Sequence, residues 1–168
     1  RDDSVAMREM AENTRVLIST VGPYLHPGEP AVKAAAEAGI SYLDLTGEPG
    51  FVDAMWLKYH EVAVSTGARL VHACGFDSVP YDLGALYVVD ELPDDVPITV
   101  KGYIRAAASF SGGTYHSAIT QFAQLRTARK VAAARRRHEG RPQQRRIRGG
   151  GVPGRAPREI GGYGMPLP

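Results

Sequence analysis

Three polar loops in this sequence carry residue types that could hold a ligand or move a proton. They are Thr20-Val21-Gly22-Pro23-Tyr24, Thr46-Gly47-Glu48 and Cys74-Gly75-Phe76-Asp77-Ser78. Glycine–proline turns let the backbone approach a flat ligand, because the glycine has no side chain to obstruct it. Carboxylates can accept hydrogen bonds from the hydroxyls of a sugar, and tyrosine hydroxyls can donate to a carbonyl group and polarise it. These loops are therefore where we look for function.

Each loop follows a short apolar run that predicts a β-strand. We place the strands at about residues 15–20, 41–46 and 69–73, spaced as strand–helix–strand crossover units are. The runs are apolar on both faces, which is typical of buried parallel strands. Ligands bind at the carboxyl ends of such strands, so the three loops should share one rim of the sheet.

Segments with helical periodicity lie between these strands. Apolar residues recur at three- and four-residue steps across residues 31–38 and 51–63, and Gly39 and Gly67 follow as left-handed caps. Residues 4–13 have the pattern of a helix end. The alternation of strands and helices predicts an α/β fold containing a partial Rossmann-like, doubly wound parallel sheet.

The pattern changes after residue 93. Ile98, Val100, Gly102 and Ile104 alternate with polar residues and predict a strand with one solvated face, and a turn at 111–114 precedes a long helix. We expect three parts, listed here by their ranges: 1–92, the C-terminal half of a nucleotide-binding domain; 93–138, the beginning of a second α+β domain; and 139–168, an Arg/Gly/Pro-rich loop or disordered segment.

No glycine-rich dinucleotide fingerprint precedes the first predicted strand. We therefore expect a fragment of a larger enzyme that is inactive alone. The strand at 15–20 would lie inside the complete sheet, so its apolar edge would be exposed here and stability would be marginal.

Composition excludes several classes of protein. No apolar stretch has transmembrane length, no signal peptide is visible, and the lone Cys74 excludes an internal disulfide. No histidine or cysteine pair has the spacing of metal ligands, so we predict no metal. These features favour a cytoplasmic location, with membrane association left open.

Charge divides the chain unevenly. Residues 1–125 carry 16 acidic and 8 basic side chains, whereas residues 126–168 carry 2 acidic and 12 basic ones. The basic stretch is first interpreted as solvated surface and second as a docking site for an acidic partner. Nucleic acid is not expected, because no aromatic residues interleave the arginines.

The loop motifs resemble those of the saccharopine dehydrogenase-like oxidoreductases. The matching motifs are Thr20-Val21-Gly22-Pro23-Tyr24, Asp44-Leu45-Thr46-Gly47-Glu48, Cys74-Gly75-Phe76-Asp77-Ser78-Val79-Pro80, Asp82-Leu83-Gly84 and Ser111-Gly112-Gly113-Thr114. The resemblance implies a two-domain NADP- or NAD-dependent enzyme with a Rossmann domain and an α+β domain. The third motif is most similar to the branch of trans-acting enoyl reductases, which act on acyl chains carried by polyketide synthases.

With this resemblance, the loops receive candidate roles in hydride transfer to an enoyl thioester. The candidate cofactor-binding residues are Thr20, Val21, Gly22, Pro23, Tyr24, Thr46, Gly47 and Glu48. The candidate catalytic residues are Tyr24, Asp77 and Tyr81. The candidate substrate-binding residues are Ser78, Ser111, Gly112, Gly113 and Thr114. The expected partners are a small or carrier-bound acyl substrate, an acyl-carrier protein or polyketide synthase, and a second copy of the full-length protein.

Structural roles remain open for the same residues. Gly22-Pro23 could be a plain turn with Tyr24 packed behind it, and Glu48 could anchor a neighbouring loop. We expect Asp44 to be buried against backbone amides and His72 to be structural. Asp77 or Ser78 could cap a helix entered through Pro80 and carrying Leu83, Leu86 and Tyr87 on one side. Alternative functions are a saccharopine-type amino-acid dehydrogenase and a non-catalytic module that binds an acidic partner through the basic stretch.

Overall fold

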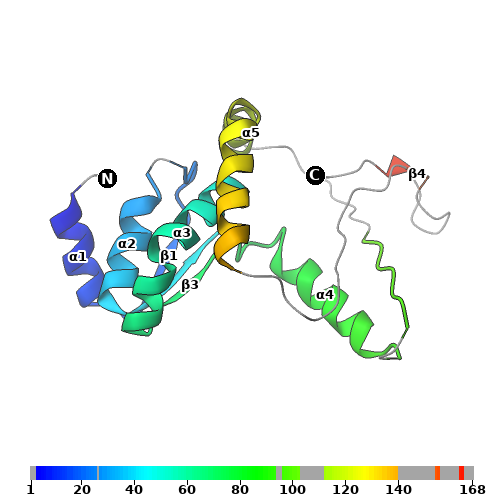
Figure 1. Ribbon diagram of the computed structural model, residues 1–168, viewed down its shortest axis with the longest axis horizontal. Coiled ribbons are helices and arrows are strands. Elements are labelled where there is room, and N and C mark those ends of the chain that lie inside the picture. The colour runs from blue at the N-terminus through cyan, green and yellow to red at the C-terminus, as the bar shows by residue number, and fades with distance from the viewer. Residues whose placement is uncertain are drawn as a thin grey trace.

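A computed structural model describes residues 3–25, 27–93, 96–102, 112–139, 154–155 and 163–164. Its main unit is a parallel sheet of three strands, β1 (Val16–Ser19), β2 (Ser41–Asp44) and β3 (Arg69–Val71), in the order β1-β2-β3 (Figure 1). The register aligns Ile18 with Leu43 and Leu43 with Val71. The prediction of a partial Rossmann-like α/β fold is confirmed.

Helices connect the strands as the periodicity predicts. Helix α1 (Ser4–Glu12) precedes β1, α2 (Glu29–Ala38) joins β1 to β2, and α3 (Pro49–Thr66) joins β2 to β3. Helix α2 ends at Gly39 with φ +71°, and α3 ends at Gly67 with φ +80°, so both glycine caps are confirmed. Left-handed backbone costs glycine little, because glycine has no Cβ to collide with the neighbouring carbonyl.

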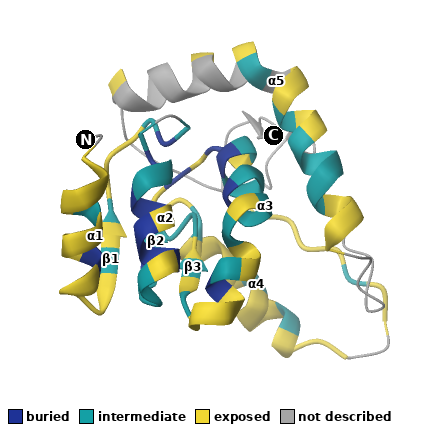
Figure 2. Ribbon diagram, turned by 60° about the vertical axis from the view of Figure 1, so that its left-hand side comes forward, coloured by how far each residue is buried: buried dark blue, intermediate teal, exposed yellow. Residues whose placement is uncertain are grey.

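The core lies between one face of the sheet and these helices (Figure 2). Its buried members are Tyr24, Ala31, Val32, Ala35, Tyr42, Phe51 and Met55. Leu17 and Leu70, which lie beside Tyr42 on neighbouring strands, pack against the same cluster. The covered face of the sheet therefore carries the hydrophobic contacts of all three strands.

The expectation that the strands are buried on both faces is wrong for the described residues. Val16, Ile18 and Val71 point to the other face and are 49%, 63% and 47% exposed. Successive crossovers through α2 and α3 cover only one side of the sheet, so the alternate side chains have no helix above them. These apolar side chains form a surface that no described part of the chain covers.

Two further helices follow β3. Helix α4 (Val79–Asp90) contains no buried residue, although its side chains are largely apolar. Ser78 occupies its N-cap position but makes no side-chain capping bond, so the proposed capping role of that hydroxyl is wrong. Helix α5 (Gly112–His138) packs against α3, where Arg135 Nη1 lies 3.0 Å from Asp53 Oδ1.

Residues 98–102 form no strand, so the predicted strand at 98–104 is wrong over that range, and its last two residues lie outside the described ones. Alternation alone does not make a strand without a partner to share its hydrogen bonds.

A two-residue antiparallel pair joins β4 (Gly154–Arg155) to β5 (Tyr163–Gly164). Among the described helices, none combines the length and the apolar character needed to cross a membrane. The three-part division of the chain stays a prediction.

Candidate functional site

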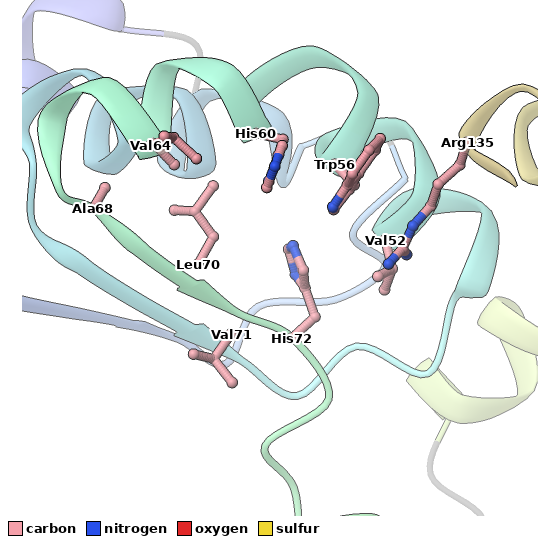
Figure 3. Close-up of a pocket in the computed structure, with 10 residues that line it drawn as sticks. Val52, Trp56, His60, Val64, Ala68, Leu70, Val71, His72 and Arg135 are labelled. Atoms are coloured by element: carbon pink, nitrogen blue, oxygen red, sulfur yellow. The ribbon is translucent and has the colours of Figure 1, made fainter. Parts of the chain in front are cut away.

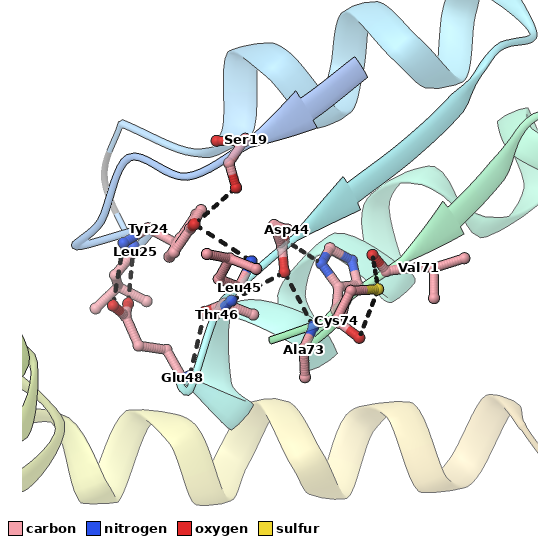
Figure 4. A network of polar contacts seen from close by, with 11 residues as sticks. Ser19, Tyr24, Leu25, Asp44, Leu45, Thr46, Glu48, Val71, Ala73 and Cys74 are labelled. Carbon is pink, nitrogen blue, oxygen red and sulfur yellow. Dashed lines mark hydrogen bonds and ion pairs between the residues drawn. The ribbon is translucent and has the colours of Figure 1, made fainter. Parts of the chain in front are cut away.

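The three loops meet at the carboxyl ends of the strands, as predicted (Figure 4). The loop after β1 reaches the loop after β2 through Tyr24, whose hydroxyl donates to the Ser19 carbonyl at 2.9 Å and accepts from Leu45 N–H at 3.3 Å. Cys74 N–H, in the loop after β3, donates to the Asp44 carbonyl at 2.7 Å. One rim therefore joins segments that are far apart in the sequence.

Glu48 fixes the first loop to the second. Its Oε1 accepts from Tyr24 N–H at 3.0 Å and its Oε2 accepts from Leu25 N–H at 2.9 Å. The side chain is buried, so these charge-assisted bonds replace hydration that the carboxylate has lost. This geometry is the loop anchor that the sequence left open as one role for Glu48.

Asp44 joins the second loop to the third. It is fully buried, and its Oδ1 accepts from the backbone N–H groups of Thr46 and Ala73, both at 3.1 Å. Its Oδ2 lies 2.6 Å from Nδ1 of His72. Burial alone would raise the pKa of Asp44, but the hydrogen bonds from His72 and from the two amides outweigh it, and the pKa falls below its usual value.

The pairing of Asp44 with His72 was missed by the sequence reasoning, which expected only backbone partners. The alignment of β2 with β3 indicates this pairing. Leu43 lies beside Val71, so Asp44, the last residue of β2, and His72, which directly follows β3, must also lie side by side on the covered face. A carboxylate and an imidazole at matching positions of neighbouring parallel strands are therefore expected to meet.

Tyr24 is buried, and burial raises the pKa of its phenol. It therefore keeps its proton at neutral pH and donates it to the Ser19 carbonyl. Its ring packs against Phe51, with the ring centroids 5.8 Å apart. In this arrangement Tyr24 is a tie between loops, and its role as a proton donor to a substrate stays a prediction.

The open part of the rim is formed by the first loop and by Gly47. Thr20, Val21 and Gly22 are exposed beside the end of β1, and Pro23 is half-buried. Thr46 is buried, but the next residue, Gly47, is exposed, and a Cβ placed on Gly47 would meet no atom within 4 Å. The predicted cofactor residues thus divide into an exposed strip that a ligand can reach and a buried set that holds the strip in place.

The other predicted residues lie around the third loop or away from it. Asp77 and Tyr81 are exposed and Ser78 is half-buried. Gly112 is exposed in the first turn of α5, which also contains Gly113 and Thr114, and Ser111 lies outside the described residues. Within the described ranges no group of three or more potential ligand side chains could hold a metal ion.

The chemistry of the rim favours a neutral ligand group over a phosphate. Two amides in the first turn of α3, those of Phe51 and Val52, already donate to the Glu48 carbonyl. The carboxylates of Asp44 and Glu48 are buried against the amides of the rim loops, and their negative charge would repel a phosphate group. Neutral hydroxyl and amide groups could still bind along the exposed residues 20–22 of the first loop.

Comparison with known proteins identifies relatives of this chain. Over 148 residues, 84% of the chain, it is 36% identical to a protein of Arabidopsis thaliana named as a mitochondrial saccharopine dehydrogenase-like oxidoreductase. It is 37% identical over 131 residues, 75% of the chain, to the human saccharopine dehydrogenase-like oxidoreductase. The chain belongs to the saccharopine dehydrogenase-like oxidoreductases.

A third relative, from Mycobacterium tuberculosis, is named as a trans-acting enoyl reductase and is 41% identical over 131 residues, 77% of the chain. These alignments cover 32%, 30% and 31% of the three relatives, so the chain spans about a third of their length. No family model matches the chain. No solved structure matches it either.

Proposed function

We propose that this chain supplies part of the cofactor site of an NADP- or NAD-dependent oxidoreductase. The observation that carries the proposal is the convergence of three loops at the carboxyl ends of β1, β2 and β3, with residues 20–22 and 47 exposed. The names of the relatives support redox chemistry. The ribose and nicotinamide would lie along this exposed strip of residues.

The chain's own residues hold this strip rather than perform the redox step. Glu48 and Tyr24 fix the first loop, and Asp44 with His72 fixes the other two. When bound, the nicotinamide supplies a hydride. A rigid rim keeps the position of the bound group constant, which is the main contribution a protein makes to hydride transfer.

The proposed acceptor is an enoyl thioester, because the mycobacterial relative is named as an enoyl reductase. A hydride would add to the β-carbon and a proton to the α-carbon of such a substrate. Among the candidate acids, Asp77 and Tyr81 are exposed next to the third loop, whereas the hydroxyl of Tyr24 already donates to a backbone carbonyl. Asp77 and Tyr81 are therefore better placed to deliver the proton.

The test uses a chimaera in which this chain replaces the matching segment of the mycobacterial relative. NADPH and NADH are titrated separately and the nicotinamide fluorescence is recorded. Gly47→Val should weaken binding at least tenfold, because the new side chain fills the open space beside the second loop. Gly84→Val, which enters open space on α4, should leave the affinity unchanged. A folded chimaera that binds neither nucleotide contradicts the proposal.

A second candidate function rests on the surface of α5. Five cations, Arg126, Arg129, Lys130, Arg136 and Arg137, are all exposed, and their spacing places them along one side of the helix. Arg135 lies on the opposite side, against α3. We infer that this basic stripe docks an acidic protein such as an acyl carrier, since it has no carboxylate of its own to neutralise it.

Charge reversal tests the docking role. The double variant Arg129→Glu/Lys130→Glu should abolish binding of an acidic acyl-carrier protein in a salt-dependent pull-down, with NADPH binding by the chimaera unchanged. Arg135→Lys, on the other side of α5, serves as the control. If the unmodified chimaera, the double variant and the Arg135→Lys variant all retain the carrier equally, the basic stripe has no docking role.

A further inference from the structure

A cavity of about 400 Å³ lies between α3, β3 and the end of α5 (Figure 3). Its volume is within the range of sites that hold small molecules. The cavity is separate from the proposed cofactor site, because the exposed strip at residues 20–22 and 47 does not line it. A ligand bound here would therefore occupy a second site.

The charge in the lining of this cavity is already compensated. Among the described residues that line it, Arg135 is the one cation. Its guanidinium donates through Nη1 to Asp53 at 3.0 Å and through Nη2 to Glu139 at 2.9 Å. An ionic ligand would lose hydration on entering without meeting an uncompensated opposite charge. The cavity therefore favours a neutral ligand.

Most of the remaining lining is aliphatic. The aliphatic residues are Val52, Ala63, Val64, Ala68, Leu70 and Val71. A hydrocarbon body would cover these side chains and gain free energy from leaving water. The ligand that fits this lining is therefore largely apolar as well as neutral.

His72 adds a hydrogen-bond acceptor to the lining. Its Nδ1 lies 2.6 Å from Oδ2 of Asp44, and since a carboxylate can only accept, Nδ1 carries the proton of this bond. In the neutral form of the imidazole, Nε2 then carries the lone pair. The His72 side chain is 11% exposed and that of Asp44 is not exposed at all, so a ligand reaches the imidazole rather than the carboxylate.

Trp56 adds a hydrogen-bond donor. The ring of His60 stacks on the indole with the centroids 4.6 Å apart, and the guanidinium carbon of Arg135 lies 5.2 Å from the centre of the same ring. These contacts use the faces of the indole, whereas its N–H lies in the plane of the ring. Figure 3 shows the indole nitrogen of Trp56 and the imidazole of His72 turned towards the same part of the cavity. One hydroxyl group can accept from the indole and donate to the imidazole.

We propose that this cavity binds a small neutral alcohol, whose hydroxyl group accepts from the Trp56 indole and donates to Nε2 of His72. The hydrocarbon body of the alcohol lies against Val64 and Leu70. The bond between His72 and Asp44 fixes the orientation of the imidazole before the ligand arrives, which lowers the entropic cost of binding. The site does not depend on the proposed nucleotide binding.

The test compares compounds that share a six-membered ring: cyclohexanol, cyclohexanone, cyclohexylammonium and cyclohexanecarboxylate. Trp56 is the only tryptophan in the chain, so its indole N–H gives a single signal in a proton–nitrogen correlation spectrum. Cyclohexanol should shift this signal with a saturable curve. Cyclohexanone can accept but cannot donate, so it should bind about tenfold more weakly because it leaves the His72 acceptor unpaired.

The two ions test the neutrality of the site. Each should bind at least about tenfold more weakly than cyclohexanol, because each loses hydration without gaining an opposite charge. The proposal is overturned if cyclohexanol gives no saturable shift. It is also overturned if the ketone or either ion binds as tightly as the alcohol.

Two neighbouring substitutions test whether the cavity is the place of binding. Val64→Phe enlarges a side chain that lines the cavity and should weaken cyclohexanol binding about tenfold, because the new ring takes space that the ligand needs. Ser65→Phe adds the same ring at the next residue of α3, which does not line the cavity, and should leave the affinity unchanged. Both residues are exposed, so both variants should fold, which circular dichroism checks. Equal affinities of the two variants would mean that the alcohol binds elsewhere.

Discussion

Helices α3 and α4 both follow a loop of the rim and both have a proline in their first turn, yet they use their apolar residues differently. Helix α3 buries Phe51, Met55 and Ala63 against the core. Helix α4 buries nothing, and Phe76 just before it is 81% exposed. Apolar content predicts that a surface is suited to burial, but only the surrounding fold decides whether it is buried.

The largest expected effect compares the same substitution, phenylalanine to alanine, at α3 and just before α4. Phe51→Ala should lower the free energy of unfolding by about 3–5 kcal/mol, because a fully buried ring that contacts Tyr24 and His72 is lost. Phe76→Ala should change it by less than about 0.5 kcal/mol. Urea unfolding followed by circular dichroism measures both. Similar losses would mean that Phe76 is buried in solution.

A smaller effect is expected at the buried carboxylate of the rim. Glu48→Gln should lower the free energy of unfolding by about 2 kcal/mol, because the amide can accept from only one of the N–H groups of Tyr24 and Leu25 and opposes the other with its own donor. Glu37→Gln is the control, since its pair with Lys33 is exposed and 3.8 Å long. Limited proteolysis at residues 20–28 gives an independent readout. An undiminished stability would show that Glu48 does not hold the loop.

Acid should weaken the rim in a defined direction. The pKa of Asp44 is lower in the folded chain than in the unfolded one, so its contribution to stability is present above about pH 4 and disappears as the pH falls further. One carboxyl contributes a slope of at most about 1.4 kcal/mol per pH unit. Asp44→Asn should reduce the slope between pH 5 and pH 3, as measured by urea unfolding.

Glu29 provides the comparison for this titration. Its pKa is also lowered, chiefly by the hydrogen bond from Lys58, but that pair lies at the surface. Salt should therefore suppress the contribution of Glu29 more than that of Asp44. If Glu29→Gln and Asp44→Asn change the slope equally at high salt, the buried site has no special role.

The smallest effect on stability is expected on α4. Leu86→Glu should change the free energy of unfolding by less than about 0.5 kcal/mol, because Leu86 is 58% exposed. It should nevertheless reduce self-association at high concentration, since an exposed apolar surface favours contacts between molecules. Analytical ultracentrifugation measures this, with Asp82→Glu as the control on the same helix. Unchanged association would indicate that the molecules contact one another through the open face of the sheet and not through α4.

The strands, the glycine caps and the shared rim could all be predicted from the sequence. Gly39 and Gly67 mark helix ends by a local requirement for left-handed backbone, and the rim follows from parallel pairing. The exposure of Val16 and Ile18 could not be predicted, because a run of apolar residues does not specify which element, if any, packs against it. Local propensity also misplaced the strand at 98–104 and the Ser78 cap, since each needs a partner group that the sequence does not specify.

The hydrogen bonds of Glu48 and Asp44 couple the motions of the rim loops. Each carboxylate is shared between two loops, so no loop can separate from the sheet without leaving a buried charge poorly compensated. Local opening of one loop should therefore require opening of all three. The backbone amides of Tyr24, Leu25, Thr46 and Ala73 would then exchange with deuterium at rates set by a single shared opening event.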